Sequence, residues 1–329
     1  MVALITTNTG SFPRIGEGKD EQILRRAYSD IDTGKIGKEE LLSAHRKLTA
    51  EVLGIQARVG LDLVTDGQIL WNDPISHVLS TIAGIEIEQL MRFFDTNFYY
   101  RQPIIQKKLS WKRSVLLDEF IFAQSVSERP VKPVLMGPYS LARLSVDHAY
   151  NKFSLLAEAM CEIIAKEVSE LSRAGAKIIQ IDEPAILQNP VDLGLMQKLI
   201  TEIAKVKGNA QLALYTYFGD AAPFYEKLQR FPIDILGLDF SYSPNLTEVI
   251  SALGTSKTLG LGIIDGRNTR LETEDDIFPM LDSVLSAHGV KQCYLNPSCG
   301  LEYLPKTKAI TKLENMVKLR DKYIGGKNE

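Results

Sequence analysis

Eight short apolar runs alternate with longer amphipathic stretches along most of this chain. The runs are continuous rather than alternating in polarity, which is typical of strands buried on both faces. Eightfold alternation of strands and helices predicts an α/β fold, specifically a (β/α)8 TIM barrel. The expected strands are Ala3–Thr7, Asp62–Thr65, Val131–Met136, Lys177–Ile181, Gln211–Thr216, Ile235–Leu238, Thr258–Ile264 and Gln292–Leu295.

Helical periodicity fills the segments between these runs. The clearest helices are expected at Phe153–Ala174, Val191–Lys207, Glu272–Ala287 and Leu304–Tyr323. A length of 329 residues exceeds that of a typical barrel, so insertions are required. The largest should occupy roughly residues 70–130, as a helix, a hairpin-like excursion and a second helix. Because no linker or low-complexity tract divides the chain, we expect one elaborated barrel over 1–329, rather than two domains.

Charge and cysteine content exclude several functional classes. A net charge of −3 gives no general attraction to nucleic acid or to an anionic membrane. No apolar stretch approaches the roughly 18 residues needed to span a bilayer, and the N-terminal apolar segment is too short for a signal peptide. Three scattered cysteines do not form a disulfide framework, so we expect a cytoplasmic protein.

Polar or glycine-rich turns follow nearly every expected strand. In a barrel of this kind the chemistry is built at the carboxyl ends of the strands. Because eight turns of this type converge on one end of the barrel, we expect the site there. They are Gly10–Arg14, Asp66–Gln68, Gly137–Pro138, Asp182–Pro184, Tyr215–Tyr217, Asp239, Asp265–Asn268 and Ser298–Cys299.

Asp182 and Glu183 are adjacent carboxylates at the end of the fourth run. Neighbouring strand residues point to opposite sides, so only one of the two can face the barrel axis. One interpretation is a carboxylate that accepts hydrogen bonds from a substrate ammonium or polar ring. The other is a helix-capping Asp182 beside a surface Glu183. Given the other polar strand ends, we favour Asp182 as a catalytic or substrate-binding residue.

Other polar residues are further candidates for the site, and several of them allow two interpretations. Arg267 can bind an anion or pair with a neighbouring carboxylate. Arg25 and Lys107 can bind a polyanionic tail or lie as solvated surface. Gln68 offers an amide where a carboxylate would suit a cationic amine better, and the two tyrosines at 215 and 217 suit packing and hydrogen bonding more than catalysis.

Cys299 lies in the turn Asn-Pro-Ser-Cys-Gly-Leu and resembles a metal thiolate without partners. A thiolate zinc site needs three or four convergent ligands, usually cysteine, histidine or a carboxylate. The sequence contains no His-x-Cys, Cys-x-x-Cys or His-Glu-x-x-His motif. Zinc is therefore possible only with an incomplete ligand set, in which Asp239 and Cys299 are the remnant candidates. Cys293, inside its strand, should be an inert core thiol.

Four strings in the same order resemble the cobalamin-independent methionine synthase family. They are Thr6–Arg14, Val134–Pro138, Ile179–Ala185 and Asn296–Leu301. The resemblance implies transfer of a methyl group from methyltetrahydrofolate to homocysteine on zinc. The full-length enzymes of the family have two barrels, of which only the C-terminal one holds zinc.

Several segments look closer to the N-terminal, non-zinc half of the family, including Phe12–Gly16, Phe94–Tyr100 and Gly266–Asn268. The resemblance places the four zinc ligands of the catalytic half at Tyr215, Tyr217, Asp239 and Cys299. Two phenols cannot replace an imidazole and a thiolate.

The resemblance also indicates substrate-binding residues. Gln68 stands where the catalytic half has a glutamate for the ammonium of homocysteine, whereas Asp182 is retained. Arg25 and Lys107 match residues associated with the glutamate tail of folate, and Arg14 and Arg267 complete the substrate-binding candidates.

Three functions follow from the resemblance. The leading hypothesis is a free-standing barrel that assists a separate zinc-bearing catalytic chain. The alternatives are a stand-alone methyltransferase with an altered metal site, in which Asp182 or Cys299 would be catalytic, and a folate- or pterin-binding module.

Overall fold

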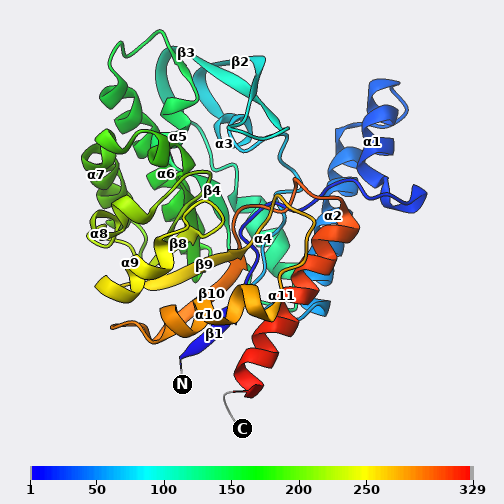
Figure 1. The fold of residues 1–329 in the computed structure, drawn as a ribbon. Helices are drawn as coiled ribbons and strands as arrows, with labels where there is room; N and C mark the ends of the chain where they lie inside the picture. The colour runs from blue at the N-terminus through cyan, green and yellow to red at the C-terminus, as the bar shows by residue number, and fades with distance from the viewer. Residues whose placement is uncertain (1, 327–329) are drawn as a thin grey trace.

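A parallel sheet of seven strands, in the order β1–β10–β9–β8–β7–β6–β4, forms the centre of the protein. The structure is a computed structural model that describes residues 2–326, apart from the side chain of residue 20. All strand pairs in this sheet are parallel, and the chain begins and ends on the same side of it (Figure 1). The strands are β1 (Ala3–Thr6), β4 (Val134–Met136), β6 (Ile178–Asp182), β7 (Gln211–Thr216), β8 (Ile235–Asp239), β9 (Thr258–Ile264) and β10 (Gln292–Pro297).

Residues 62–65 close this sheet into a barrel between β1 and β4. Thr7 pairs in parallel with Leu63, and Val64 pairs in parallel with Val131. The second of the eight expected strands is thus reduced to two isolated bridges, but it keeps its place in the ring. The expected (β/α)8 barrel is confirmed.

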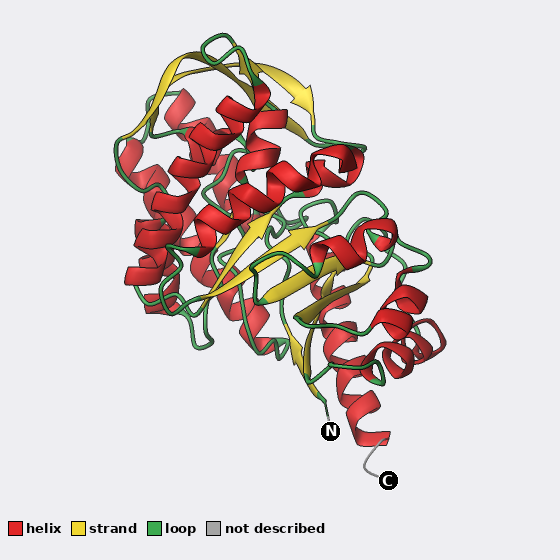
Figure 2. Ribbon diagram, turned by 90° about the vertical axis from the view of Figure 1, so that its left-hand side faces the viewer, coloured by secondary structure: helices red, strands yellow, loops and turns green. Residues whose placement is uncertain are grey.

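Helices cover the outside of the strands (Figure 2). The four helices expected most clearly are present as α6, α7, α10 and α11, with ends within a few residues of the prediction. None of the helices within residues 2–326 has the length and apolar composition needed to cross a membrane. The helices are α1 (Ile23–Asp32), α2 (Lys38–Arg58), α3 (Ser76–Leu79), α4 (Leu117–Val126), α5 (Pro138–Arg143), α6 (Phe153–Arg173), α7 (Leu193–Ala204), α8 (Tyr225–Leu228), α9 (Leu246–Leu253), α10 (Glu274–Leu285) and α11 (Lys306–Gly326).

A long antiparallel hairpin fills the expected insertion and lies at the carboxyl ends of the barrel strands (Figure 1). It consists of β2 (Ile82–Arg92) and β3 (Tyr99–Trp111), between helices α3 and α4. A two-residue strand, β5 (Val146–Asp147), pairs in parallel with β3. The hairpin thus brings the insertion over the end of the barrel where the site is expected. The expectation of a single domain over 1–329 stays a prediction.

The ring of Tyr215 fills the interior of the barrel, because two neighbouring strands carry glycine beside it. A Cβ atom on Gly237 would lie 2.3 Å from the ring, and one on Gly260 would lie 2.6 Å from the phenol oxygen. Interior positions of small barrels are packed with side chains in this way. Tyr215 is therefore a packing residue, as its sequence context indicated. Its inner cluster also contains Leu63, Ile178, Ala213, Ile235 and Tyr294.

Candidate functional site

A small enclosed pocket lies above this inner cluster, at the mouth of the barrel. Its cavity of about 20 Å³ has room for about one water molecule. Asp182 and Glu302 line it, and among the described residues around it none is a lysine or an arginine. The other lining residues are Thr9, Gly10, Ser11, Gln68, Trp71, Pro74, Phe93, Met136, Tyr217, Gly300 and Tyr303.

Asp182 is the last residue of β6 and is 5% exposed. Its Oδ1 accepts a hydrogen bond from Gln180 Nε2 at 2.7 Å, and its Oδ2 accepts one from the Tyr217 hydroxyl at 3.1 Å. Burial raises the pKa of Asp182 to about 7, against the hydrogen bonds and the charge of Lys132. Asp182 is therefore an acid that can hold or release a proton near neutral pH.

Lys132 lies buried beneath Asp182, inside the barrel. Its Nζ donates to Gln180 Oε1 at 2.5 Å and lies 4.9 Å from the centre of the Tyr215 ring. Burial lowers the pKa of Lys132 to about 7, although the charge of Asp182 acts against this shift. Gln180 thus links a buried lysine to a buried carboxylate. In the sequence, the burial of Lys132 was indicated by its position inside the apolar run 131–136.

Glu183 has a different role from its neighbour. It is fully buried, and its Oε1 accepts from the backbone N–H of Tyr139 at 2.9 Å. Its Oε2 accepts from the backbone N–H and the hydroxyl of Ser140, at 2.7 and 2.6 Å. Glu183 therefore caps the first turn of α5. The alternative of a capping Asp182 and a surface Glu183 is wrong, because it is the glutamate that caps and is buried.

Gln68 faces the pocket from a left-handed turn. Its φ is 54° and that of Gly67 is 72°. The backbone N–H of Gln68 donates to Asp66 Oδ1 at 2.9 Å, which holds this conformation. A residue other than glycine in this region costs about 1 kcal/mol and is often found at functional sites. The side-chain amide lies beside Gly10, where an added Cβ would be 3.5 Å from Nε2, an ordinary van der Waals distance.

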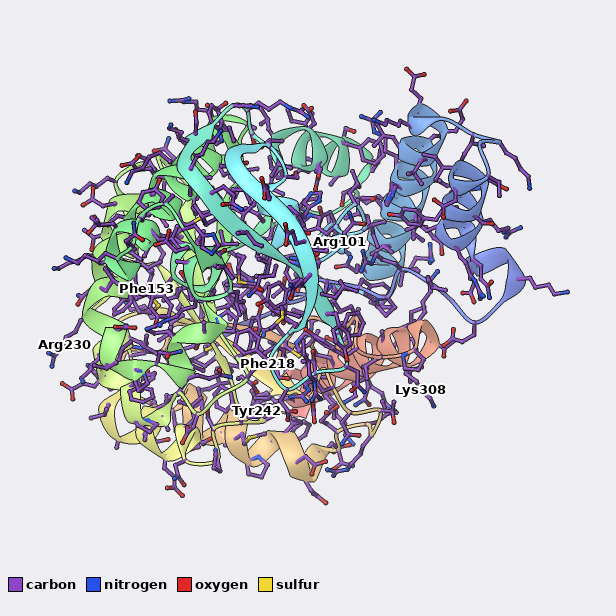
Figure 3. The ribbon with its side chains drawn as sticks, turned by 90° about the horizontal axis from the view of Figure 1, so that it is seen from above. Arg101, Phe153, Phe218, Arg230, Tyr242 and Lys308 are labelled. Carbon is purple, nitrogen blue, oxygen red and sulfur yellow. The ribbon has the colours of Figure 1, made fainter. Side chains whose placement is uncertain are left out.

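The turn of the β2–β3 hairpin covers the mouth through a set of aromatic contacts. We call this set the mouth cluster: Phe93, Phe94, Phe98, Tyr217, Phe218, Tyr242 and Tyr303. Phe218 is its centre, with ring centroids 4.7 Å from Tyr217, 5.5 Å from Phe94 and 5.9 Å from Tyr303. Seen from above, Phe218 and Tyr242 lie beside the end of the hairpin (Figure 3). The hairpin turn therefore closes the pocket on its outer side.

Arg267 connects this turn to the barrel through hydrogen bonds. Its guanidinium donates hydrogen bonds to the Tyr242 hydroxyl and to the backbone carbonyl of Asp95, within the turn. It also lies 5.5 Å from the ring centres of Phe218 and Tyr242. The two interpretations for Arg267 were anion binding and pairing with a neighbouring carboxylate. The structure favours contact with protein groups, and the guanidinium nitrogen lies 4.0 Å from the nearer carboxylate oxygen of Asp95.

Replacing Arg267 with alanine should speed amide hydrogen exchange in residues 93–98 by about tenfold, because two hydrogen bonds to the turn and its neighbour are lost. Exchange monitored by mass spectrometry measures this directly. The control is Arg230→Ala, which removes an exposed ion pair with Glu226 far from the turn. Unchanged exchange in 93–98 would mean that aromatic packing alone holds the hairpin.

The remaining substrate-binding candidates lie outside the pocket. Arg14 donates to the Asn72 carbonyl at 3.4 Å, and its charge lowers the pKa of Glu302, which burial raises. Arg25, on α1, and Lys107, on β3, are both exposed. Helix α1 and the hairpin project from different parts of the molecule (Figure 1). The structure does not bring Arg25 and Lys107 together at the pocket, and their role stays a prediction.

The residues at the four expected zinc-ligand positions do not fit zinc. Asp239 Oδ1 accepts hydrogen bonds from the turn that follows it, and Oδ2 accepts one from the backbone N–H of Phe218 at 3.2 Å. Burial raises the pKa of Cys299 well above its usual value, which disfavours the thiolate form. The Tyr217 hydroxyl donates to Asp182. Within residues 2–326, no three side chains of the histidine, cysteine or carboxylate type converge to hold a metal.

The purified chain should accordingly hold less than about 0.1 zinc per molecule, since a thiolate site needs three or four convergent ligands. Elemental analysis by plasma mass spectrometry checks this, with Cys299→Ser as the matched variant. About one zinc per chain in the wild type, lost in the variant, would contradict the argument from the ligand set.

Three residues of the site were not found from the sequence. Glu302 follows directly on the Asn-Pro-Ser-Cys-Gly-Leu string, and Trp71 lies three positions after Gln68. Their closeness to these motifs in the sequence could have marked both as candidate site residues. Phe218 follows Tyr217 and has a φ of 64°, which only the folded backbone reveals. Its backbone N–H is held by Asp239, so this carboxylate supports the mouth cluster.

The fold and site define a (β/α)8 barrel with an acidic pocket at its mouth and, among residues 2–326, no set of side chains that fits a metal. Residues 4–322 match the family described as "Cobalamin-independent synthase, Catalytic domain". The chain is 32% identical over 320 residues to a methionine synthase of Sulfurisphaera tokodaii, covering 96% of this chain and 91% of that one. It is 31% identical over 319 residues to a methionine synthase of Saccharolobus solfataricus, covering 95% and 93%.

Solved structures share the fold. A B12-independent methionine synthase from Shewanella sp. W3-18-1, in complex with selenomethionine, has a TM-score of 0.77 at 22% identity, covering 98% of this chain and 99% of that one. A putative vitamin-B12 independent methionine synthase from Listeria monocytogenes has a TM-score of 0.76 at 18% identity, covering 98% of each chain. The chain belongs to the cobalamin-independent methionine synthase family, as its strings indicated. The matching description is that of the catalytic domain, and the closer likeness to the N-terminal half stays a prediction.

Proposed function

We propose that this chain is a barrel without zinc that binds an amino acid of the homocysteine or methionine type and assists a separate zinc-bearing chain in methyl transfer. The proposal is supported by a whole-barrel family match combined with a mouth that keeps Asp182. Tyr217, which donates to Asp182, and Cys299, whose thiol pKa is raised by burial, stand where the resemblance places metal ligands. The catalytic zinc would then be supplied by the other chain.

An amino-acid ligand is supported by the pocket itself and by a relative. Asp182 and Glu302 are the carboxyl groups that line the pocket, and the Shewanella protein with this fold was solved with selenomethionine. A methyltetrahydrofolate-type donor is the expected second ligand of the pair of chains. A cytoplasmic location is consistent with three free, buried cysteines.

A stand-alone methyltransferase is the less favoured function. It would need the Cys299 sulfur as a thiolate, or as a metal ligand, near the reacting methyl group. Burial and the charge of Asp239 both act against ionisation of this thiol. A folate-binding module is likewise less favoured, because Arg25 and Lys107 are exposed on separate elements.

The test is to mix the pure chain with a zinc-bearing single-barrel family member from the same cell. We expect the two to co-elute in size-exclusion chromatography. The rate of methyl transfer from methyltetrahydrofolate to homocysteine should rise on mixing and saturate at an equimolar ratio. An unrelated barrel of similar size is the control. Absence of both a complex and a rate increase, with a verified partner, would refute the assisting role.

A further inference from the structure

We infer that Glu302 supplies the negative charge by which the mouth pocket recognises a primary ammonium group, a charge that Gln68 does not provide. This inference rests on the proposal that the pocket holds an amino acid, and it does not depend on docking of a second chain. It assigns a specificity-determining role to a residue outside the motifs that place the chain in its family.

The charge of the pocket selects the ligand class. Its two ionisable carboxylates are Asp182 and Glu302, and neither belongs to an ion pair among residues 2–326. The charge of Arg14 acts on Glu302 and that of Lys132 acts on Asp182, but neither cation lies within ion-pair distance. A buried carboxylate without a paired cation is stabilised by a ligand that brings one. A ligand that carries its positive charge into this pocket would therefore be favoured over a neutral or anionic one.

The walls of the pocket favour the same chemistry. Trp71, Phe93, Tyr217 and Tyr303 contribute aromatic surface around the two carboxylates. Aromatic faces attract cations, most strongly where water is excluded. The cavity of about 20 Å³ accommodates one water molecule, and an ammonium group is of similar size. The rest of a bound amino acid would extend toward the hairpin turn, which must yield to admit it.

Asp182 alone is poorly placed to supply a full charge. It accepts hydrogen bonds from Gln180 and Tyr217, and Lys132 lies beneath it with Gln180 between them. Its negative charge is thus partly balanced from below. Glu302 lines the same pocket from the segment that follows β10, where the Ser11 hydroxyl hydrogen-bonds to its carboxylate. The charge of Arg14 and this hydrogen bond favour the ionised form of Glu302 against its burial, and its carboxylate lines the pocket without a paired cation.

Gln68 and Glu302 line the same pocket, so a carboxylate and an amide can be exchanged between the two positions. Moving the carboxylate from position 302 to position 68 should keep the total charge of the pocket. The double variant Glu302→Gln/Gln68→Glu therefore separates the effect of charge from an effect of Glu302 on structure.

Isothermal titration calorimetry of the isolated chain with L-methionine tests the inference. Glu302→Gln should weaken binding by about tenfold or more, because a charge-assisted hydrogen bond is lost. The double variant should recover most of the affinity. The deaminated analogue 4-(methylthio)butanoate should not bind measurably. Glu314→Gln, an exposed change on α11, is the matched control and should bind as the wild type does. Circular dichroism verifies that each variant is folded.

Three results would overturn the inference. Equal affinity of Glu302→Gln and wild type would show that this charge is not used. A folded double variant without recovered affinity would mean that Glu302 acts through structure. If L-methionine does not bind the wild-type chain at all, the amino-acid part of the proposed function fails as well, whereas the docking experiment would still stand by itself.

Discussion

Replacing Glu183 with alanine should lower the free energy of unfolding by roughly 3–5 kcal/mol, because three buried donors lose their acceptor. These donors are the backbone N–H groups of Tyr139 and Ser140 and the Ser140 hydroxyl. All are buried, so water cannot replace the carboxylate without opening the packing around α5. Urea denaturation followed by circular dichroism measures the change.

Two comparisons make this result specific. Glu314→Ala, on the exposed side of α11, should change the free energy of unfolding by less than about 0.5 kcal/mol. Asp182→Asn should keep the chain folded, because an amide still offers an acceptor and fills the same volume, but it should weaken ligand binding. If Glu183→Ala is no less stable than Asp182→Asn, the capping role derived for Glu183 is wrong.

Stability should fall as the pH rises from about 5 to 8. Glu183 contributes to the fall because burial raises its pKa to about 7, and Asp182 should contribute a comparable share. Its folded pKa of about 7 lies above the ordinary value of 3.8 because the carboxylate is buried. The folded state therefore binds the proton more tightly than the unfolded state, and this stability is fully present below about pH 4. It is lost as the pH rises through about 7, by at most about 4 kcal/mol. Denaturant unfolding at a series of pH values measures the slope.

Asp182→Asn should remove the Asp182 share of that slope and leave the Glu183 share, since the amide does not titrate. Lys132 acts with the opposite sign: its folded pKa of about 7 lies below the ordinary 10.5, so its contribution rises with pH between those values. Lys132→Met should remove this rise. A slope between pH 5 and 8 that is the same in Asp182→Asn and wild type would show that Asp182 is not protonated in the folded chain.

The main features of the fold could be predicted from the sequence because the pattern of buried strands is local. Runs such as those that form β6 and β8 are apolar throughout, since both faces of these strands are buried. The strand-end motifs could also be predicted, and Asp182 does line the pocket that they form. The expected strand at residues 62–65 is not formed as a continuous strand, because only two isolated bridges pair it with its neighbours.

The sequence by itself determined the barrel and the family, since the strand pattern and residue identity at a few strand ends decide them. The tertiary structure alone decided which residues meet. Burial of Lys132 beneath Asp182, capping of α5 by Glu183 and closure of the mouth by the hairpin all join segments distant in the chain. Such contacts depend on how the barrel closes and on the space left by Gly237 and Gly260, which local patterns do not encode.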